Sequence, residues 1–230
     1  MIKDAIDARL MSSANFVRAG AVLADIGTDH GYLPIFLLKA GKIKRAVLSD
    51  INEEPLAAAR RNVEDEGLSD KCTLILADGA ASLSGLGITD YTICGMGGEL
   101  IADIIDGAPD MRRPGIRLIL QPMSRQAALR RKLFSLGFSV LDEKYSSVSG
   151  KHYVTVLAEY TGIAHTVSDI EAELGFEFSH TDDRADYVLY MQTKLASLER
   201  AARGMMMGGD DVSREKALIE EIKRRLLRIK

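Results

Sequence analysis

Carboxylates and glycines follow the first short apolar run of this chain, in the stretch Leu23–Pro34. Asp25 lies near the end of that run, and Gly27 and Gly31 flank Asp29 in the turn that follows. Such a turn leads from a buried strand into a helix and brings backbone N–H groups up to an anionic or polar ligand. The dinucleotide fingerprint G-x-G-x-x-G is missing, and a carboxylate in the turn would repel a diphosphate. It would attract an ammonium or sulfonium group, so the pattern favours S-adenosylmethionine and methyl transfer over a nicotinamide cofactor.

Acidic residues also end the next two apolar runs, and the carboxyl ends of parallel strands meet at one edge of a sheet. Asp50 comes 25 residues after Asp25 and could accept hydrogen bonds from both hydroxyls of a ribose. Asp78 could accept from an adenine amino group, beside which Gly79 leaves room for the ring. The alternatives are structural: Asp50 could cap a helix, Asp78 could begin a turn, and His30 could be a structural hydrogen-bonding residue.

The stretch Gly95-Met96-Gly97-Gly98 ends the fourth apolar run. Three glycines in four residues cost chain entropy, which makes sense where backbone must approach a flat ligand. In methyltransferases this position lies beside the transferable methyl group and its acceptor. The chain lacks the Asn/Asp-Pro-Pro-aromatic tetrapeptide of many exocyclic-amine methyltransferases, which argues against adenine N6 as the acceptor. Cys94, just before the glycines, is expected in the core rather than as a nucleophile.

Composition sets the class of protein. The chain has 230 residues, 47% of them hydrophobic, and a formal net charge of −3. No apolar run reaches the length of a membrane span and no signal peptide is recognised, so we expect a globular, cytoplasmic protein. Cys72 and Cys94 form no metal or disulfide motif. The histidines have no metal-ligand spacing, and no metal is expected: His30, His152, His165 and His180. A nucleic-acid partner would need local basic patches.

Strands and helices alternate along the first two thirds of the chain, which predicts βαβ units and a parallel sheet. The expected strands are Ala21–Ile26, Arg45–Asp50, Cys72–Ala77, Tyr91–Gly95 and Ile116–Gln121. A helix over residues 1–19 precedes them, and the helices expected between and after them are Tyr32–Ala40, Glu53–Glu66, Glu99–Asp106 and Ser124–Leu136, with Ser124 as N-cap. Phe138–Ser147 and His152–Tyr160 are joined by Ser149-Gly150 and should form an antiparallel hairpin. The prediction is an α/β fold with the Rossmann-like sheet of the class I methyltransferases.

A different pattern begins near Thr161. Apolar residues from Val188 to Met205, and again from Val212 to Ile229, follow a heptad spacing, which predicts an antiparallel helical hairpin with coiled-coil seams. The expected turn is Gly204–Asp211, with Asp211 as N-cap. We therefore expect a catalytic domain over residues 1–161 and a small α-helical domain over residues 162–230. The alternative is that these helices simply pack on the sheet.

Several of these motifs together resemble one family, the bacterial tRNA (adenine(22)-N1)-methyltransferases, or TrmK family. They are D-I-G-T-D-H-G-Y-L-P, S-D-I-N-x-x-P-L-x-x-A, A-D-G, G-M-G-G-x-L-I and L-Q-P, followed by the helical tail. The resemblance implies a Rossmann-like catalytic domain, a C-terminal coiled-coil domain, S-adenosylmethionine as donor and N1 of a tRNA D-loop adenine as acceptor. With the strand-end residues, the expected cofactor site comprises Asp25, Gly27, Thr28, Asp29, His30, Asp50, Ile51, Asp78, Gly79, Gly95 and Met96.

Adenine N1 is neutral near pH 7 and needs no prior deprotonation, so catalysis is expected to rest on positioning and electrostatics. Asp29 is the first candidate for a carboxylate near the reacting centre and Glu99 the second. Gln121 could hydrogen-bond the edge of the target base, which must be turned out of its stack, and Gly97 and Gly98 would provide the room.

Two basic clusters could hold the phosphates of tRNA. One comprises Arg125, Arg130, Arg131 and Lys132, and the other comprises Lys223, Arg224, Arg225, Arg228 and Lys230. Either could instead be a solvated helix face. A small-molecule methyltransferase with the hairpin as a lid, and a non-catalytic RNA-binding module on the same fold, are the competing hypotheses. A monomer is expected, with a weak dimer as the alternative.

Overall fold

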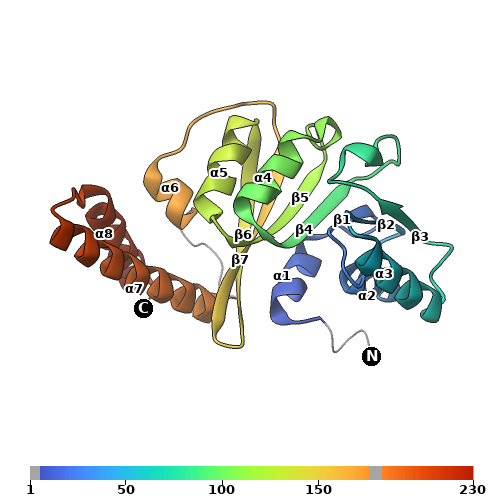
Figure 1. The fold of residues 1–230 in the computed structure, drawn as a ribbon, viewed down its shortest axis with the longest axis horizontal. Coiled ribbons are helices and arrows are strands. Elements are labelled where there is room, and N and C mark those ends of the chain that lie inside the picture. Colours follow the sequence, from blue (N-terminus) through green and yellow to red (C-terminus); the bar gives the residue numbers. More distant parts are fainter. Residues whose placement is uncertain (1–5, 177–182, 230) are drawn as a thin grey trace.

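The computed structural model describes residues 6–176 and 183–229 of the chain. A seven-stranded sheet forms its centre, in the order β3-β2-β1-β4-β5-β7-β6 (Figure 1). The strands are β1 (Val22–Ile26), β2 (Arg45–Asp50), β3 (Cys72–Leu76), β4 (Asp90–Gly97), β5 (Arg117–Ser124), β6 (Phe138–Val148) and β7 (Lys151–Tyr160). The first five run parallel, whereas β7 pairs antiparallel with both β5 and β6. This confirms the predicted class I methyltransferase sheet.

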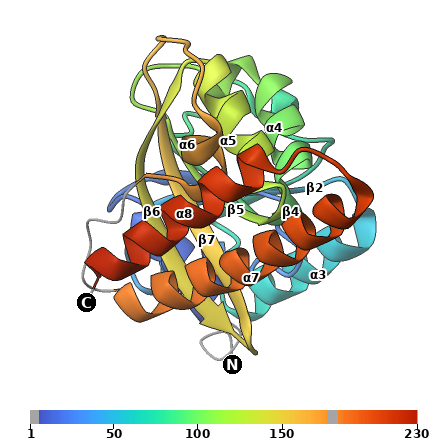
Figure 2. The ribbon, with the colours of Figure 1, turned by 90° about the vertical axis from the view of Figure 1, so that its left-hand side faces the viewer.

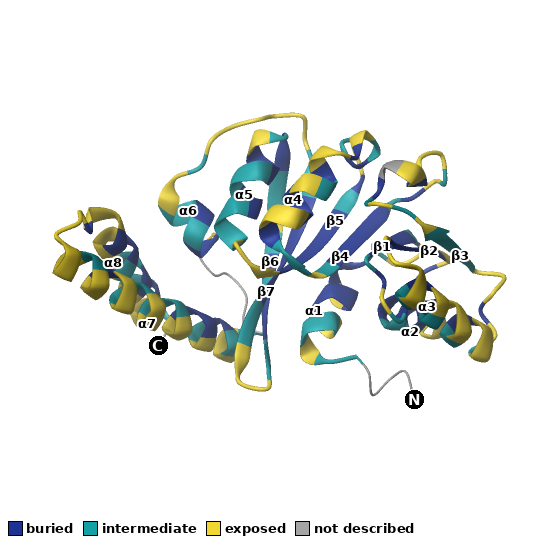
Figure 3. Cartoon of the chain, viewed as in Figure 1, coloured by how far each residue is buried: buried dark blue, intermediate teal, exposed yellow. Residues whose placement is uncertain are grey.

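Helices cover both faces of the sheet. They are α1 (Ala8–Phe16), α2 (Tyr32–Lys39), α3 (Glu53–Asp65), α4 (Gly98–Asp106) and α5 (Gln126–Ser135). Side chains of α1, α2 and α3 share one apolar cluster with the sheet, and those of α4 and α5 share another. Successive residues of β1 point to opposite faces of the sheet. Leu23 therefore packs with α1, α2 and α3, and Ala24 packs with α4 and α5. Strands buried on both faces therefore appear as short continuous apolar runs (Figure 3).

The turn between β6 and β7 is the predicted Ser149-Gly150 pair, with φ of 49° and 74°. Left-handed backbone at both positions is the geometry of a two-residue hairpin turn. Helix boundaries differ more from expectation. α1 is shorter than the predicted helix over residues 1–19, of which 1–5 lie outside the described residues. Ser124 is the last residue of β5, and the residue that precedes α5 is Arg125, also in the left-handed region at φ 55°.

The C-terminal part contains a short helix, α6 (Asp169–Leu174), and two long ones, α7 (Arg184–Gly208) and α8 (Ser213–Arg228). α7 and α8 run side by side (Figure 2), which confirms the predicted helical hairpin. Tyr187 and Met191 of α7 share the core of the sheet, as do Leu218 and Ile222 of α8. The predicted turn begins too early, because α7 continues through Gly204 to Gly208 and is followed by the C-cap Gly209, whose φ is 82°. A glycine inside a helix costs only about 1 kcal/mol, which packing can offset.

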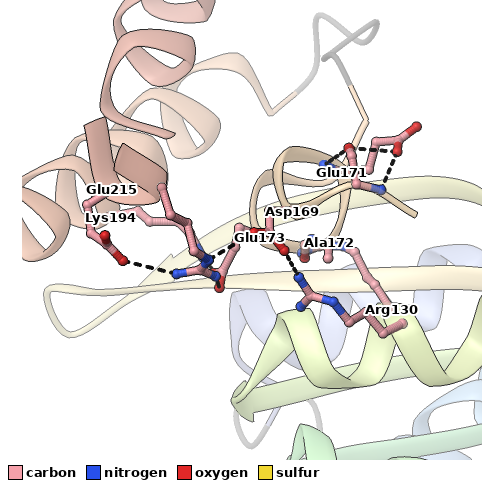
Figure 4. Close-up of polar contacts among 10 residues, drawn as sticks. Arg130, Asp169, Glu171, Ala172, Glu173, Lys194 and Glu215 are labelled. Atoms are coloured by element: carbon pink, nitrogen blue, oxygen red, sulfur yellow. Dashed lines mark hydrogen bonds and ion pairs between the residues drawn. The ribbon is translucent and has the colours of Figure 1, made fainter. Parts of the chain in front are cut away.

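α6 was not predicted from the sequence, yet it joins three other helices (Figure 4). Its capping box is formed by Ser168 and Glu171. Asp169 accepts from Arg214 of α8 at 3.1 Å, and Glu173 accepts from Lys194 of α7 at 3.0 Å and from Arg214 at 2.6 Å. A helix this short is marginal by itself, so these tertiary contacts stabilise it.

Candidate active site

A cavity of about 630 Å³ opens at the carboxyl edge of the parallel strands. Its lining comes from the ends of β1 to β4 and from α1, α2 and α4. The cavity brings together every residue predicted to bind the cofactor, namely Asp25, Gly27, Thr28, Asp29, His30, Asp50, Ile51, Asp78, Gly79, Gly95 and Met96. Of the residues predicted to be catalytic, Asp29 lines it, whereas Gly97, Gly98, Glu99 and Gln121 do not.

Asp25 is a buried carboxylate in the wall of this cleft, with only 6% of its surface exposed. One carboxylate oxygen accepts from the Thr28 hydroxyl at 2.7 Å and the other from the Thr92 hydroxyl at 2.6 Å. Burial raises the pKa of Asp25 from 3.8 to about 6, against the two hydroxyls, which lower it. The charge of Asp50 raises that pKa further. The ionised form is therefore costly at this buried position, and a cation would stabilise it.

Four backbone N–H groups of the turn after β1 already donate hydrogen bonds to oxygen atoms of the protein. Gly27 and Thr28 donate to the Ser49 carbonyl at 2.8 and 3.0 Å, and Gly31 donates to the Thr28 carbonyl at 2.9 Å. The N–H of Asp29 points to Asp50 Oδ2 at 3.3 Å. The expectation that this turn offers its backbone donors to a ligand is therefore wrong for these four groups, because neighbouring carbonyl and carboxylate groups accept from them.

Glycine at position 27 is favoured by its left-handed backbone, and the Met96 side chain packs against it. Its φ is 69°, and an added Cβ would lie 2.0 Å from the terminal methyl carbon of Met96. The β1 turn and the end of β4 thus pack directly against each other.

Asp50 and Ile51 form the wall at the end of β2. Asp50 is 8% exposed and its Oδ1 accepts from the Asn52 N–H at 2.9 Å, just before α3 begins. This bond reaches the N-cap residue and not the first turn of α3, which has no side-chain cap, so Asp50 does not cap that helix. Asp50 lines the cleft instead. Ile51 is 59% exposed, an apolar side chain at a polar opening. Asp78 and Gly79 follow the end of β3 and line the same cleft. Asp78 is exposed, and Gly79 has a φ of 70°.

The end of β4 differs from expectation in two places. Gln121 is fully buried, and its Oε1 accepts from the Gly95 N–H at 3.1 Å and from Arg9 Nη1 at 2.8 Å. The prediction that Gln121 contacts a target base is therefore wrong, because its amide holds the glycine loop from inside. Gly98 is also internal: an added Cβ would lie 2.5 Å from the Arg125 carbonyl oxygen. Close packing of two chain segments, and not a ligand, requires that glycine.

Gly97, in contrast, has room for a side chain. Its φ is −68°, and an added Cβ would meet only Ser124 Oγ, at 3.5 Å. Glu99 follows on α4 with 65% of its side chain exposed, 3.9 Å from the guanidinium of Arg125. The exposed side of this loop is thus formed by Gly97, Glu99 and Arg125.

An aromatic pair lies at the opening of the cleft. The rings of His30 and Tyr32 stack with centroids 5.1 Å apart, and His30 Nε2 lies 3.5 Å from Asp29 Oδ1. The side chain of Asp29 is 70% exposed, so its carboxylate is accessible to a ligand that enters. Tyr32 was assigned to the first helical turn from the sequence, and it lines the cleft as well.

Sequence reasoning missed the contribution of α1. Asp7, Arg9 and Leu10 all line the cleft, and no motif in that amphipathic stretch distinguished them. Ser13 of the same helix accepts from the Cys94 thiol at 3.4 Å. Burial raises the pKa of Cys94 to about 12, so this thiol stays protonated at neutral pH, in agreement with its assignment to the core.

The basic clusters need two corrections. Arg130 is 1% exposed and binds Glu143 Oε1 at 2.6 Å and the Ala172 carbonyl at 2.9 Å. Arg225 is 5% exposed and donates to the Gly175 carbonyl at 3.0 Å. Neither arginine can reach a phosphate from these positions, because both join α6 to the rest of the chain.

The signal for this burial was present in the sequence. Arg130 lies three and four residues before Leu133 and Phe134, and Arg225 lies three residues after Ile222. Both therefore belong to the apolar face of their helix.

The other basic residues have exposed surface and acidic neighbours. Arg131 pairs with Asp169, Lys132 with Asp106 at 2.6 Å, Lys223 with Glu199 at 3.1 Å and Arg224 with Glu221 at 2.5 Å. Arg125 is the most exposed of the first cluster, at 71% of its side chain. Arg228 is exposed near the end of α8, and Lys230 lies outside the described residues, as does His180.

Within the described ranges, no group of three metal-ligating side chains comes together. In the same part of the chain, no helix combines the length and the apolar character that crossing a bilayer requires.

Comparisons with known proteins agree on the family. The family model described as a methyltransferase domain matches residues 6–156. The tRNA (adenine(22)-N(1))-methyltransferase of Bacillus subtilis (strain 168) is 35% identical over 151 residues. That alignment covers 66% of this chain and 63% of the relative, so the chain spans less than two thirds of that relative's length.

Solved structures match over nearly the whole chain. Streptococcus pneumoniae Sp1610, described as a candidate tRNA (m1A22) methyltransferase and solved with S-adenosyl-L-methionine, has a TM-score of 0.79 at 32% identity. The match covers 96% of this chain and 99% of that one. The B. subtilis m1A22 tRNA methyltransferase TrmK has a TM-score of 0.77 at 28% identity, with 96% of both chains covered. The chain belongs to the methyltransferase-domain family and, within it, to the TrmK family.

Proposed function

We propose that this protein transfers the methyl group of S-adenosylmethionine to N1 of adenine 22 in tRNA. The observation that carries the proposal is the cleft at the carboxyl edge, where all the cofactor residues predicted from the TrmK motifs line one cavity. The relatives reported above are named for this tRNA position, and one of them was solved with S-adenosylmethionine.

The residues of the cleft fit the cofactor group by group. Asp25 is a buried acid whose ionised form needs a cation, which the ammonium or sulfonium would provide. Asp50 presents a carboxylate for ribose hydroxyls, and Ile51 presents an exposed apolar surface for the adenine ring. Asp78 and Gly79 stand at the end of β3, where the adenine amino group would be read. When bound, S-adenosylmethionine supplies a methyl group activated by a positively charged sulfur.

The task left to the chain is positioning. Because adenine N1 is neutral and carries a lone pair near pH 7, the acceptor needs no base to activate it, and methylation leaves a positive charge on the ring. The exposed carboxylate of Asp29 is placed at the opening of the cleft, where it would stabilise that charge. A target base turned out of the tRNA stack could pack on the His30–Tyr32 pair. Gly97 leaves the acceptor side free of side-chain atoms.

The test is methyl transfer from radiolabelled S-adenosylmethionine to unmodified tRNA transcripts, followed by nucleoside analysis. We expect 1-methyladenosine, and we expect it to disappear when adenine 22 is replaced by guanine. A transcript with a different D-loop adenine replaced is the matched control. Methylation of a small molecule without tRNA would instead support the competing enzyme hypothesis, and cofactor binding without transfer to any tRNA would support a binding module.

A further inference from the structure

Two buried arginines from different parts of the chain hold the C-terminal end of the short helix α6. Arg130 of α5 donates to the Ala172 carbonyl at 2.9 Å. Arg225 of α8 donates from Nη1 to the carbonyls of Gly175 at 3.0 Å and Phe176 at 3.1 Å. Carbonyls at the end of a helix have no partner within it, so the two guanidinium groups supply the missing donors. The end of α6 therefore connects α5 with α8.

The ion pair beneath this contact fits the chain after α6 closely. Arg130 pairs with Glu143 of β6 at 2.6 Å, and both side chains are buried. Gly175 has a φ of 68°, and an added Cβ would lie 2.0 Å from Glu143 Oε2. The Tyr145 hydroxyl donates to the same oxygen at 3.0 Å, and the Tyr145 ring packs edge-on against Tyr187 of α7, with centroids 4.9 Å apart. One buried polar cluster thus joins α5, β6, α6 and α7.

Ion pairs connect the rest of α6 with the same neighbours (Figure 4). Asp169 accepts from Arg131 of α5 and from Arg214 of α8. Glu173 accepts from Lys194 of α7 and, like Asp169, from Arg214. Hydrogen bonds between charged groups are directional, and several of them act on one short helix. The helices α7 and α8 are therefore held in a defined orientation against the sheet through α6.

Arg225 belongs to the stretch of α8 that carries two of the candidate tRNA-binding residues. Lys223 and Arg228 are exposed, whereas Arg225 between them is 5% exposed and faces α6. The three residues lie within about 8 Å along the helix axis. From the buried side, Arg225 thus fixes the stretch that presents Lys223 and Arg228 to solvent.

We propose that Arg225 is a positioning residue for tRNA, which keeps Lys223 and Arg228 at a fixed place relative to the cofactor cleft. This inference rests on tRNA as the substrate of the proposed function. A folded tRNA is stiff, so its phosphates can meet α8 while the target base enters the cleft only if the protein keeps the two places in register. Arg225 itself acts from inside the protein and binds no phosphate.

The experiment is a mutant cycle on tRNA affinity, measured by filter binding to the full chain. Arg225→Met keeps an unbranched apolar side chain and removes the donors to α6. It should weaken tRNA binding by about 3- to 10-fold, as should Lys223→Gln with Arg228→Gln. If Arg225 acts through these two residues, all three changes together should weaken binding by at most about twofold beyond the Lys223 and Arg228 changes alone. Independent effects would multiply instead.

Methylation kinetics separate positioning from folding. At a temperature well below the midpoint of thermal unfolding, Arg225→Met should raise KM for tRNA and leave kcat and the affinity for S-adenosylhomocysteine within about twofold of wild type. Arg225→Lys is the milder change and should recover part of the lost tRNA affinity, because it restores a charged donor. Arg45→Met is the control of equal charge. Arg45 at the start of β2 donates to the Leu86 carbonyl at 2.5 Å, and its loss should leave tRNA affinity unchanged.

Three results would overturn the assignment. The first is wild-type tRNA affinity in folded Arg225→Met or in Arg225→Gln, which would leave Arg225 a purely structural role. The second is a set of independent effects in the cycle. The third is wild-type affinity in Lys223→Gln with Arg228→Gln, because Arg225 would then have nothing to position. The proposed function fails separately, if wild-type protein binds S-adenosylhomocysteine but methylates no tRNA.

Discussion

Asp25 shows how one residue can oppose stability and favour binding. Its pKa rises from 3.8 to about 6 because the carboxylate is buried. The folded state therefore binds a proton more tightly than the unfolded state does. Stability that depends on this group is present at low pH and is lost as the pH rises from about 4 to about 6. Above pH 6 the Asp25 carboxylate is ionised, and the cation of a bound ligand would stabilise it.

We predict that Asp25→Asn stabilises the free protein at pH 7 by roughly 1–3 kcal/mol, an upper bound set by about two pK units. The gain should vanish near pH 3, below the unfolded pKa of 3.8, where the wild-type carboxyl is protonated in both states. Urea unfolding at pH 7 and at pH 3 measures it, and titration with S-adenosylhomocysteine should show weaker binding by the variant at pH 7. A variant that is less stable than wild type by the same amount at both pH values would contradict the prediction.

Gly97 and Gly98 form a matched pair for a second prediction. Gly98→Ala should destabilise the fold by about 1–3 kcal/mol, because its Cβ would lie 2.5 Å from a backbone oxygen. Gly97→Ala should leave the midpoint of thermal unfolding nearly unchanged, because its Cβ has room. If Gly97 faces the acceptor base, Gly97→Ala should still lower the rate of methyl transfer. Equal loss of stability in both variants would refute the distinction.

At the scale of elements, the sequence was most informative where burial is continuous. All the predicted strands were found. The central strands are buried apolar runs, which have few alternative structures. α6 could not be found in this way. Its residues Asp169–Leu174 are short and acidic, and their stability comes from arginine and lysine partners distant in sequence. The contribution of α1 was missed for the same reason, since Arg9 gains its place through Gln121, far along the chain.

A third prediction concerns the buried ion pair between Arg130 of α5 and Glu143 of β6, beside α6. Glu143→Gln should destabilise the protein by about 3 kcal/mol, because it leaves the guanidinium of Arg130 buried without its charge partner. Arg131→Gln, one residue further along α5, should cost less than about 1 kcal/mol, because its pair with Asp169 is exposed. Urea denaturation measures both, and similar losses would show that burial does not set the difference.

At the scale of the whole molecule, the structure changes which basic residues could meet tRNA. The helices α7 and α8 pack at the β6–β7 end of the sheet (Figures 1 and 2), whereas the cofactor cleft is lined from the ends of β1 to β4. Arg130 and Arg225 are removed from the candidate surface by burial. Lys223 and Arg228 remain exposed on α8, and Arg125 remains exposed beside Glu99 at the start of α4. A tRNA that binds both basic regions would have to contact Arg125 and the α8 residues Lys223 and Arg228 at the same time.

The last prediction concerns the exposed basic residues of α8. The double variant Lys223→Gln with Arg228→Gln should weaken tRNA binding and reduce the slope of log affinity against log salt by about one to two, since each phosphate contact contributes somewhat less than one to that slope. Affinity for S-adenosylhomocysteine should stay unchanged, because both residues lie outside the cleft. Arg60→Gln with Arg61→Gln, two exposed arginines on α3, is the matched control of equal charge. Filter binding at several salt concentrations measures the slope. If the double variant keeps the wild-type slope while the α3 control loses it, tRNA lies across α3 and not along the C-terminal hairpin.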